Sequence, residues 1–170
     1  STKGITLMKQ AFIAIGGNLL PEGYDDLFQL MAEAISVLKD EPLEVIAQSQ
    51  WYETAPVPIS DQPWFLNAVL KIETSLSSHD LLVRLHEIEA DFGRVRKVRN
   101  EARILDLDVI DYDGQIVDDG VINLPHPRLH LRAFVLYPIR DLDPHWNHPI
   151  LQKSIDQMID EIPEGQDIRI

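Results

Sequence analysis

The sequence contains no cysteine among its 170 residues. A disulfide framework, a thiol nucleophile and a cysteine-based zinc site are therefore excluded. Positive charge is also scarce, because 15 Lys and Arg residues stand against 28 Asp and Glu residues, for a formal net charge of -13. Nucleic acids and anionic membranes are held mainly by Lys and Arg, so neither is expected as a partner.

Long apolar runs are missing as well. No stretch approaches the roughly 20 residues of a transmembrane helix, and the sequence has no Walker A motif, Gly-rich kinase loop or dinucleotide-binding fingerprint. Hydrophobic residues make up 45% of the chain, which suits one compact domain. We expect a cytoplasmic monomer with one domain over residues 8–170 and with residues 1–7 as a tag remnant or upstream extension.

The hydrophobic pattern predicts both strands and helices. Short apolar or alternating runs favour strands, and apolar residues three and four apart favour helices. The predicted strands span 11–15, 43–52, 66–74 and 104–112, and the predicted helices span about 25–41, 77–93 and 131–140. This order matches the split β-α-β pattern, so we expect an α+β, ferredoxin-like fold. Its mostly antiparallel sheet would be covered by helices, with long active-site loops.

Two aspartates lie on one face of a predicted strand. Leu105, Leu107 and Val109 point to one face, so Asp106 and Asp108 point together to the other. Magnesium is commonly held by one or two carboxylates plus substrate phosphates, which makes this strand a candidate metal site. The alternative is a solvated strand face on which Asp is tolerated, and the pattern alone leaves both interpretations open.

A basic stretch leads directly into the aspartate strand. Five of the 15 basic residues lie within ten positions, namely Arg94, Arg96, Lys97, Arg99 and Arg103. Arg and Lys side chains neutralise phosphate oxygens, and phosphoryl transfer needs such cations beside the metal ligands. The alternative is a solvated loop that pairs with nearby carboxylates. The adjoining aspartates favour a phosphate site.

Two further segments carry candidate binding residues. Phe65 and Asn67 share a strand face, where one side chain could stack on a flat heterocycle and the other could pair with its ring nitrogens. A hydrophobic corner with Asn67 capping a turn is the alternative. His126, in a proline-rich loop, and Arg132 could contact phosphate. A histidine in such a loop can equally be structural.

Taken in order, these segments resemble the 6-hydroxymethyl-7,8-dihydropterin pyrophosphokinase family of the folate pathway, from about Ala11 to about Pro149. The segments that carry the resemblance are Gln62–Ala68, Ile88–Arg96, Ala102–Asp108, Pro125–Arg128 and Arg132–Leu136. The resemblance implies that the pyrophosphoryl group of ATP passes to the hydroxymethyl group of the dihydropterin and that AMP is released. It implies small-molecule substrates and a ferredoxin-like fold.

The resemblance also implies roles for individual residues. Asp106 and Asp108 match the ligands of two Mg²⁺ ions, and Arg94 and Arg103 join them as catalytic candidates. The positions that match pterin contacts are Thr54, Val57, Phe65, Asn67 and Phe134. The positions on the ATP or phosphate side are Glu89, Arg94, Arg96, Lys97, Arg103, His126 and Arg132.

Several positions depart from the family pattern. Gly17 stands where Ser is common, Ala55 stands where Pro is common, and Pro127 replaces a Tyr found in some members. The segment from Val98 to Ala102 is short and lacks a Trp found in some members, so closure of that loop could differ. None of these changes removes a metal ligand or a paired aromatic residue, so an active enzyme is expected.

Two other functions remain open at this point. One is a different magnesium-dependent phospho- or nucleotidyltransferase, which would turn over ATP without a dihydropterin. The other is a non-catalytic ferredoxin-like binding module, which would tolerate loss of Asp106. The basic stretch beside the aspartates argues against the module, because a binder of a neutral heterocycle needs no such cations.

Overall fold

The computed structural model of the protein describes residues 7–56, 60–93 and 104–170. The strands are β1 (Lys9–Gly17), β2 (Leu43–Gln48), β3 (Tyr52–Thr54), β4 (Phe65–Thr74), β5 (Asp106–Tyr112), β6 (Val117–Asp118), β7 (Asn123–Leu124) and β8 (Ile168–Arg169). The helices are α1 (Leu27–Leu38), α2 (Ser78–Asp91), the 3-10 turn η1 (Leu129–Leu131), α3 (Ala133–Leu142) and α4 (Ile155–Asp160). None of the helices in these ranges is long and apolar enough to cross a membrane.

The central sheet has the strand order expected from the sequence pattern. β5 pairs with β1, β1 with β4 and β4 with β2, and each of these pairs is antiparallel. β1 and β2 both run opposite to β4, so they are parallel to each other. The order β2-β4-β1-β5 is that of two interleaved β-α-β units, which is the ferredoxin-like arrangement. β3 and β8 extend the sheet beyond this core.

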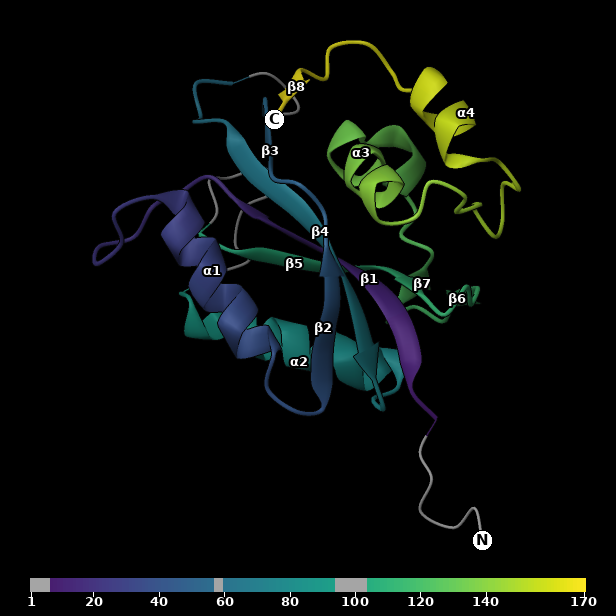
Figure 1. The fold of residues 1–170 in the computed structure, drawn as a ribbon, viewed down its shortest axis with the longest axis horizontal. Helices are drawn as coiled ribbons and strands as arrows, with labels where there is room; N and C mark the ends of the chain where they lie inside the picture. Colours follow the sequence, from purple (N-terminus) through teal and green to yellow (C-terminus); the bar gives the residue numbers. More distant parts are fainter. Residues whose placement is uncertain (1–6, 57–59, 94–103) are drawn as a thin grey trace, which may run out of the picture.

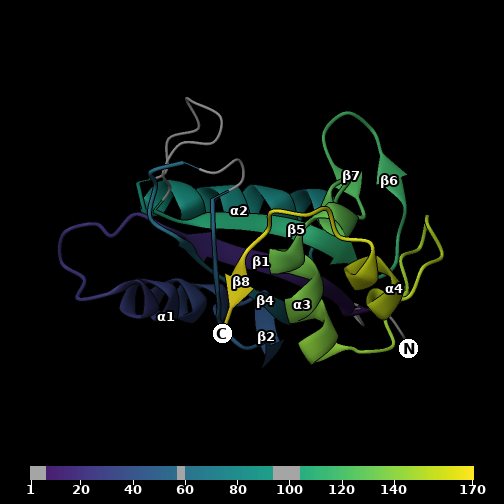
Figure 2. The ribbon, with the colours of Figure 1, turned by 90° about the horizontal axis from the view of Figure 1, so that it is seen from above.

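Helices cover both faces of the sheet. α1 and α2 lie on one face, and α3 and α4 lie on the other (Figures 1 and 2). Ile13, Leu70 and Leu107 belong to the core beneath α1 and α2, whereas Phe12 and Val69 belong to a second core with residues of α3 and α4. Alternate strand residues feed opposite cores, as the two-residue period of a strand requires.

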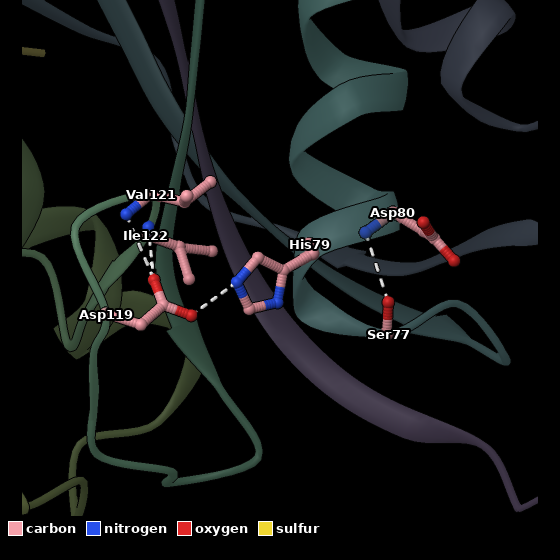
Figure 3. Close-up of polar contacts among 6 residues, drawn as sticks. All are labelled: Ser77, His79, Asp80, Asp119, Val121 and Ile122. Carbon is pink, nitrogen blue, oxygen red and sulfur yellow. Dashed lines mark hydrogen bonds and ion pairs between the residues drawn. The ribbon is translucent and has the colours of Figure 1, made fainter.

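The ends of the two long helices follow the sequence rules. The side chain of Asp26 accepts a hydrogen bond of 2.8 Å from the Gln29 amide at the start of α1. Ser77 accepts one of 3.1 Å from the Asp80 amide at the start of α2 (Figure 3). These side chains satisfy amides that have no partner within the helix. Gly93, with φ of +81°, follows the C-terminal end of α2, as predicted.

The β6–β7 hairpin is attached to the first turn of α2. Nε2 of His79 lies 2.6 Å from an Asp119 carboxylate oxygen, and the same carboxylate accepts hydrogen bonds from the amides of Val121 and Ile122 (Figure 3). These amide bonds are the main cause of a lowered pKa at Asp119, with His79 adding to it. The pair is exposed, so it orients the hairpin and adds little stability.

The prediction of one strand over residues 43–52 is wrong. β2 ends at Gln48 and β3 begins at Tyr52, and the two strands lie end to end along the same edge of β4. Buried Ser49 separates them, because its hydroxyl accepts the hydrogen bond of the Val69 amide at 2.9 Å. A Ser side chain that replaces a backbone acceptor interrupts regular pairing.

Asp111 gives the fold a pH dependence that a single substitution should remove. Its side chain is 6% exposed, and burial raises its pKa to about 6 from a model-peptide value of 3.8. A folded-state pKa above the unfolded value means that its contribution to stability is complete below pH 3.8 and is lost as the pH rises through 6. Asp111→Asn is therefore expected to stabilise the protein by about 2 to 3 kcal/mol at pH 8.

Thermal unfolding of both proteins from pH 4 to pH 8 measures this gain. The difference in Tm should be largest at pH 8 and should disappear near pH 4. Asp118→Asn, at an exposed carboxylate of β6, is the control and should produce no such gain. An equal Tm difference at both pH values would show that the effect comes from packing rather than from ionisation.

Candidate active site

The face of the sheet beneath α3 changes from apolar to polar along its length. On β1, Phe12 lies in the core while Gly16 lines an open cavity. On β5, Ile110 lies in the core while Asp106 and Asp108 line the cavity. The other face of β5 carries Leu105, Leu107 and Val109, all buried. This confirms the predicted facing of the strand, with both aspartates on the side away from those buried residues.

Three residues that are register partners on neighbouring strands connect the aspartate strand to Asn67; we call them the cavity row. Asp106 of β5 is the register partner of Gly16 of β1, and Gly16 is the register partner of Asn67 of β4. Neighbouring strands are roughly 4.8 Å apart, so the backbones of Asp106 and Asn67 are about 10 Å apart. Gly16 has no side chain, so the Asn67 amide oxygen can occupy the space where a Cβ atom would lie.

The cavity above this row has a volume of about 450 Å³, a size suited to a small molecule. Its walls come from three parts of the fold: the strand ends, the loop after β3, and the η1–α3 corner with the tail that follows α4. The candidate residues in its lining are Thr54, Phe65, Asn67, Asp106, Asp108, Arg132 and Phe134. The structure therefore brings candidate residues from four separate segments of the sequence to one cavity.

Asn67 is held in a fixed orientation. Its Nδ2 donates a hydrogen bond of 2.6 Å to the Thr54 hydroxyl, and the side chain is 8% exposed. A Cβ atom on residue 16 would collide with Asn67 Oδ1. Gly16 therefore allows Asn67 Oδ1 to lie close to the backbone of β1 while Nδ2 bonds to Thr54.

The Gly16-Gly17-Asn18 turn also fixes the neighbouring loop. Asn18 is buried, and its Nδ2 donates to Gln62 Oε1 at 3.1 Å and to the Pro63 carbonyl at 3.0 Å. Gln62 itself lines the cavity. The turn therefore connects β1 to the loop that forms one wall of the cavity, and Gly16 itself lines that cavity.

Arg128 and Arg132 bring positive charge to the cavity opposite the sheet. Both arginines line it. The guanidinium of Arg132 lies 5.3 Å from the ring centroid of Phe134, at the start of α3. A cation over an aromatic face is stabilised by the ring and is held in a defined place. Two arginines facing two carboxylates across a cavity form a suitable site for a phosphate chain with its counter-ions.

His126 lies beside this group of charges. Its Nδ1 accepts a hydrogen bond of 3.1 Å from the Arg128 amide. Burial, with help from Arg132 and Arg128, lowers its pKa to about 4, against a smaller opposing effect of Asp106. The ring is therefore neutral at pH 7, with its proton on Nε2. It adds no charge to the site, and it is not among the described residues that line the cavity. The predicted phosphate contact of His126 stays a prediction.

Glu89 lies beneath β5. Its carboxylate is 2% exposed, and Oε2 accepts a hydrogen bond of 3.0 Å from the Leu107 amide, between the two aspartates. In this structure it supports the aspartate strand from α2, and it is not among the described residues that line the cavity. The predicted ATP-side contact of Glu89 stays a prediction.

The two aspartates fit a metal site that is completed by substrate. Within the described residues, no three His, Asp or Glu side chains gather as a metal cluster. Asp106 and Asp108 offer oxygen ligands at the wall of a cavity wide enough for phosphate, which matches the way proteins bind Mg²⁺. Five candidate residues, Val57, Arg94, Arg96, Lys97 and Arg103, and most of the predicted upstream extension lie outside the described residues.

Sequence comparison identifies the family. The profile of the 7,8-dihydro-6-hydroxymethylpterin-pyrophosphokinase (HPPK) family matches residues 12–144. The chain belongs to the HPPK family. The matched range includes Gly16, Asn67, Asp106 and Asp108, and the family resemblance seen in the sequence motifs is confirmed.

Two relatives show how far the similarity to HPPK proteins extends. A 2-amino-4-hydroxy-6-hydroxymethyldihydropteridine pyrophosphokinase of Methylorubrum extorquens is 39% identical over 138 residues, which cover 81% of this chain and 84% of the relative. The folic acid synthesis protein fol1 of Schizosaccharomyces pombe is 36% identical over 166 residues, which cover 97% of this chain and 22% of the relative. The chain thus spans about a fifth of the longer folic acid synthesis proteins that it matches.

Solved structures agree on the fold. A crystal structure of wild-type HPPK-DHPS from Plasmodium falciparum superimposes with a TM-score of 0.71, covering 94% of this chain and 42% of that chain at 13% identity. At this identity the similarity shows the fold alone. The predicted α+β, ferredoxin-like fold is therefore confirmed by both the strand order and the neighbour.

The sequence reasoning missed one part of the site. Residues 163–166, in the segment between α4 and β8, line the cavity, and this segment was assigned no role from the sequence. No local motif marks this segment. Its place depends on contacts with residues more than 30 positions earlier in the chain.

Proposed function

We propose that the protein transfers the pyrophosphoryl group of ATP to the hydroxymethyl oxygen of 6-hydroxymethyl-7,8-dihydropterin, giving the pterin diphosphate and AMP in folate synthesis. The observation that carries the proposal is the row Asp106-Gly16-Asn67. It sets the Asp106 carboxylate and the oriented Asn67 amide on strands about 10 Å apart in one cavity wall, with Asp108 two residues further along β5. Membership in the HPPK family and the similarity to bacterial pyrophosphokinases support the same reaction.

Each end of the cavity has a separate task in this reaction. At one end, Asn67, Phe65 and Phe134 would hold the flat pterin by an amide contact and by stacking. At the other end, Arg128 and Arg132 would bind the phosphate chain. The hydroxymethyl oxygen then lies between the two ends, where it forms a bond to the β-phosphorus of ATP as the bond to the AMP oxygen breaks. Positioning of this kind supplies much of the catalysis in phosphoryl transfer.

Magnesium dependence is part of the proposal. Two Mg²⁺ ions bound by Asp106 and Asp108 would neutralise charge on the triphosphate. The carboxylates hold their places because Leu107, between them, is buried and donates its amide proton to Glu89. His126 Nε2–H is a further donor for a phosphate oxygen.

The decisive experiment mixes the protein with ATP, Mg²⁺ and 6-hydroxymethyl-7,8-dihydropterin and measures AMP. We expect AMP only when both the pterin and the metal are present, in equal amount to the pterin diphosphate. ATP turnover without pterin would favour another phospho- or nucleotidyltransferase. Absence of turnover together with a tolerated Asp106→Ala change would favour a binding module.

Gly16→Ala tests the role of the oriented amide. The new methyl group would displace the Asn67 side chain from its bond to Thr54. We expect the KM for the pterin to rise at least about tenfold, a loss of about 1.4 kcal/mol of binding, with little change in the KM for ATP. Steady-state kinetics measures both constants.

Thr54→Val serves as the companion variant. It keeps the side-chain shape and removes only the hydroxyl that accepts the Asn67 hydrogen bond. It should raise the pterin KM in the same direction but by less, because Asn67 is released without being pushed away. An increase confined to the ATP KM in either variant would contradict the assignment of this end of the cavity to the pterin.

A further inference from the structure

The segment that follows α4 crosses the molecule and joins two walls of the cavity. In both views it runs from α4 past α3 to β8, which lies beside β3 (Figures 1 and 2). Residues 163–166 of this segment line the cavity. We call residues 163–169 the strap. The sequence resemblance, which ends near Pro149, assigned it no role.

One end of the strap is attached to the wall that carries Thr54 and Phe65. Ile168 and Arg169 pair with β3, and the Ala55 amide donates a hydrogen bond of 3.0 Å to the Asp167 carbonyl. The Arg169 guanidinium bonds to Glu53 at 2.7 Å and lies 4.2 Å from the ring centroid of Trp64. This end is therefore held by backbone pairing, an ion pair and an aromatic contact.

The other end grips the η1–α3 corner through one side chain. Gln166 Oε1 accepts a hydrogen bond of 2.9 Å from the Ala133 amide, and Nε2 donates one of 2.6 Å to the Leu131 carbonyl. The two bonds go to the residues immediately before and after Arg132 in the sequence. An amide that uses both its acceptor and its donor on one stretch of backbone fixes the position and the orientation of that stretch.

Gln166 also replaces a missing helix cap. Residue 132 is the N-cap of α3, and its side chain makes no capping hydrogen bond. Ser, Thr, Asp or Asn usually fills this position to satisfy the first helix amides. Because Gln166 accepts the Ala133 amide from outside the helix, the N-cap position can carry an arginine that faces the cavity.

We propose that Gln166 is a positioning residue of the reaction, and that the strap sets the spacing between the wall with Phe65 and the corner with Arg132 and Phe134. This inference rests on the proposed function and adds a residue to it. The far half of α3 contacts β3 directly, through the 2.8 Å hydrogen bond from the Tyr52 hydroxyl to Asp141 and the Tyr52–Tyr137 ring contact. At the start of the helix, beside Arg132 and Phe134, Gln166 links the corner to the strap and so to β3. Loss of the two side-chain bonds should loosen both substrate contacts at once.

Gln166→Met tests the proposal, since it keeps the side-chain length and removes both hydrogen bonds. We expect the KM values for ATP and for the pterin each to rise about tenfold, while kcat at saturation changes less than threefold. Gln166→Glu keeps an acceptor for Ala133 and loses the donor to Leu131, so it should fall between Met and wild type. Gln157→Met, at an exposed position of α4, is the matched control and should change neither constant.

The kinetic pattern separates positioning from simple stabilisation. A residue that only stabilises the fold would lower the apparent kcat in proportion to the unfolded fraction and leave both KM values unchanged, and that result would overturn the proposal. Amide hydrogen exchange at Ala133 should also accelerate in Gln166→Met. Unchanged exchange would show that Gln166 does not accept the Ala133 hydrogen bond in solution, which would overturn the proposal. Wild-type protein without pterin-dependent AMP would overturn the proposed function itself. Active wild type with unchanged KM values in Gln166→Met would overturn only the role of Gln166.

Discussion

Replacement of Asp106 or Asp108 by Asn is expected to lower kcat for AMP formation at least about 1,000-fold without unfolding the protein. Each substitution removes one negative charge and one metal ligand while keeping the side-chain shape. A metal ion that neutralises transferring phosphate contributes several kcal/mol to the transition state, and each 1.36 kcal/mol is a factor of about ten in rate. Loss of a ligand should therefore outweigh the other single changes at this site.

The fold should survive because the strand is held mainly from its apolar face. Leu105, Leu107 and Val109 anchor β5 from its other face, and Glu89 accepts the Leu107 amide. Two like charges on one strand face repel each other, so removing one costs little or no stability on that account. Thermal unfolding should give a Tm within a few degrees of wild type in each variant.

Two measurements and a control variant complete this test. Rates are compared at rising Mg²⁺ concentration, Mn²⁺ binding in the presence of a non-hydrolysable ATP analogue is followed by electron paramagnetic resonance, and Asp118→Asn serves as the control. The control removes an equal charge from exposed β6 and should leave rate and metal binding unchanged. Near-normal kcat in either active-site variant would remove that aspartate from the metal site.

The aspartate strand shows what a sequence pattern can settle. Its facing depends on the two-residue period of a strand, which is a local property of the backbone. The apolar residues between the aspartates had to enter the core, so the carboxylates had to face away. The caps at Asp26 and Ser77 were predictable for the same reason, because each involves a bond to a residue three positions later.

Contacts between distant residues could not be predicted in this way. A glutamate on an amphipathic helix normally faces water, yet Glu89 is buried because the Leu107 amide, 18 residues later, needs an acceptor. Ser49 ends β2 by bonding to Val69, 20 residues away. Gln166 finds its partners only after α3, α4 and the tail have assembled. In each case the contact depends on the tertiary structure, so it cannot be predicted from hydrophobic periodicity or composition.

The family resemblance predicted more of the site than hydrophobic periodicity did, because it depends on several motifs in a fixed order along the chain. Thr54, Asn67 and Asp106 come from three strands, and no local rule would place them in one cavity, yet all three line it. The resemblance did not explain why the residue between Asn67 and Asp106 in the cavity row is a glycine. The collision of a Cβ atom with Asn67 explains physically why a residue without a side chain occupies the middle of the row.

Removal of the aromatic ring of Phe134 is expected to raise the KM for the pterin about 10- to 100-fold, with a much smaller effect on kcat. Stacking of a flat ring on an aromatic side chain contributes about 1 to 3 kcal/mol when measured by alanine substitution. Phe134 and Phe65 both line the cavity, one from the start of α3 and the other from the start of β4. Phe65→Ala should therefore give an effect of similar size.

Two further variants decide whether stacking is the cause. Phe134→Leu keeps an apolar side chain but lacks the flat aromatic face, so it should recover only part of the affinity. Phe28→Ala removes an aromatic ring that is 50% exposed on α1 and contacts Trp51, and it should leave the KM unchanged. A pterin KM within twofold of wild type in Phe134→Ala would remove this ring from the site.

The ATP constants give an additional criterion. The Arg132 guanidinium rests over the Phe134 ring, so Phe134→Ala should release that cation and raise the KM for ATP a few-fold. Phe65 has no such arginine among the described contacts, so Phe65→Ala should change the pterin constant alone. A matching ATP effect in both variants would mean that the cavity collapses as a whole, whereas an effect confined to Phe134→Ala would show that one ring serves both substrates.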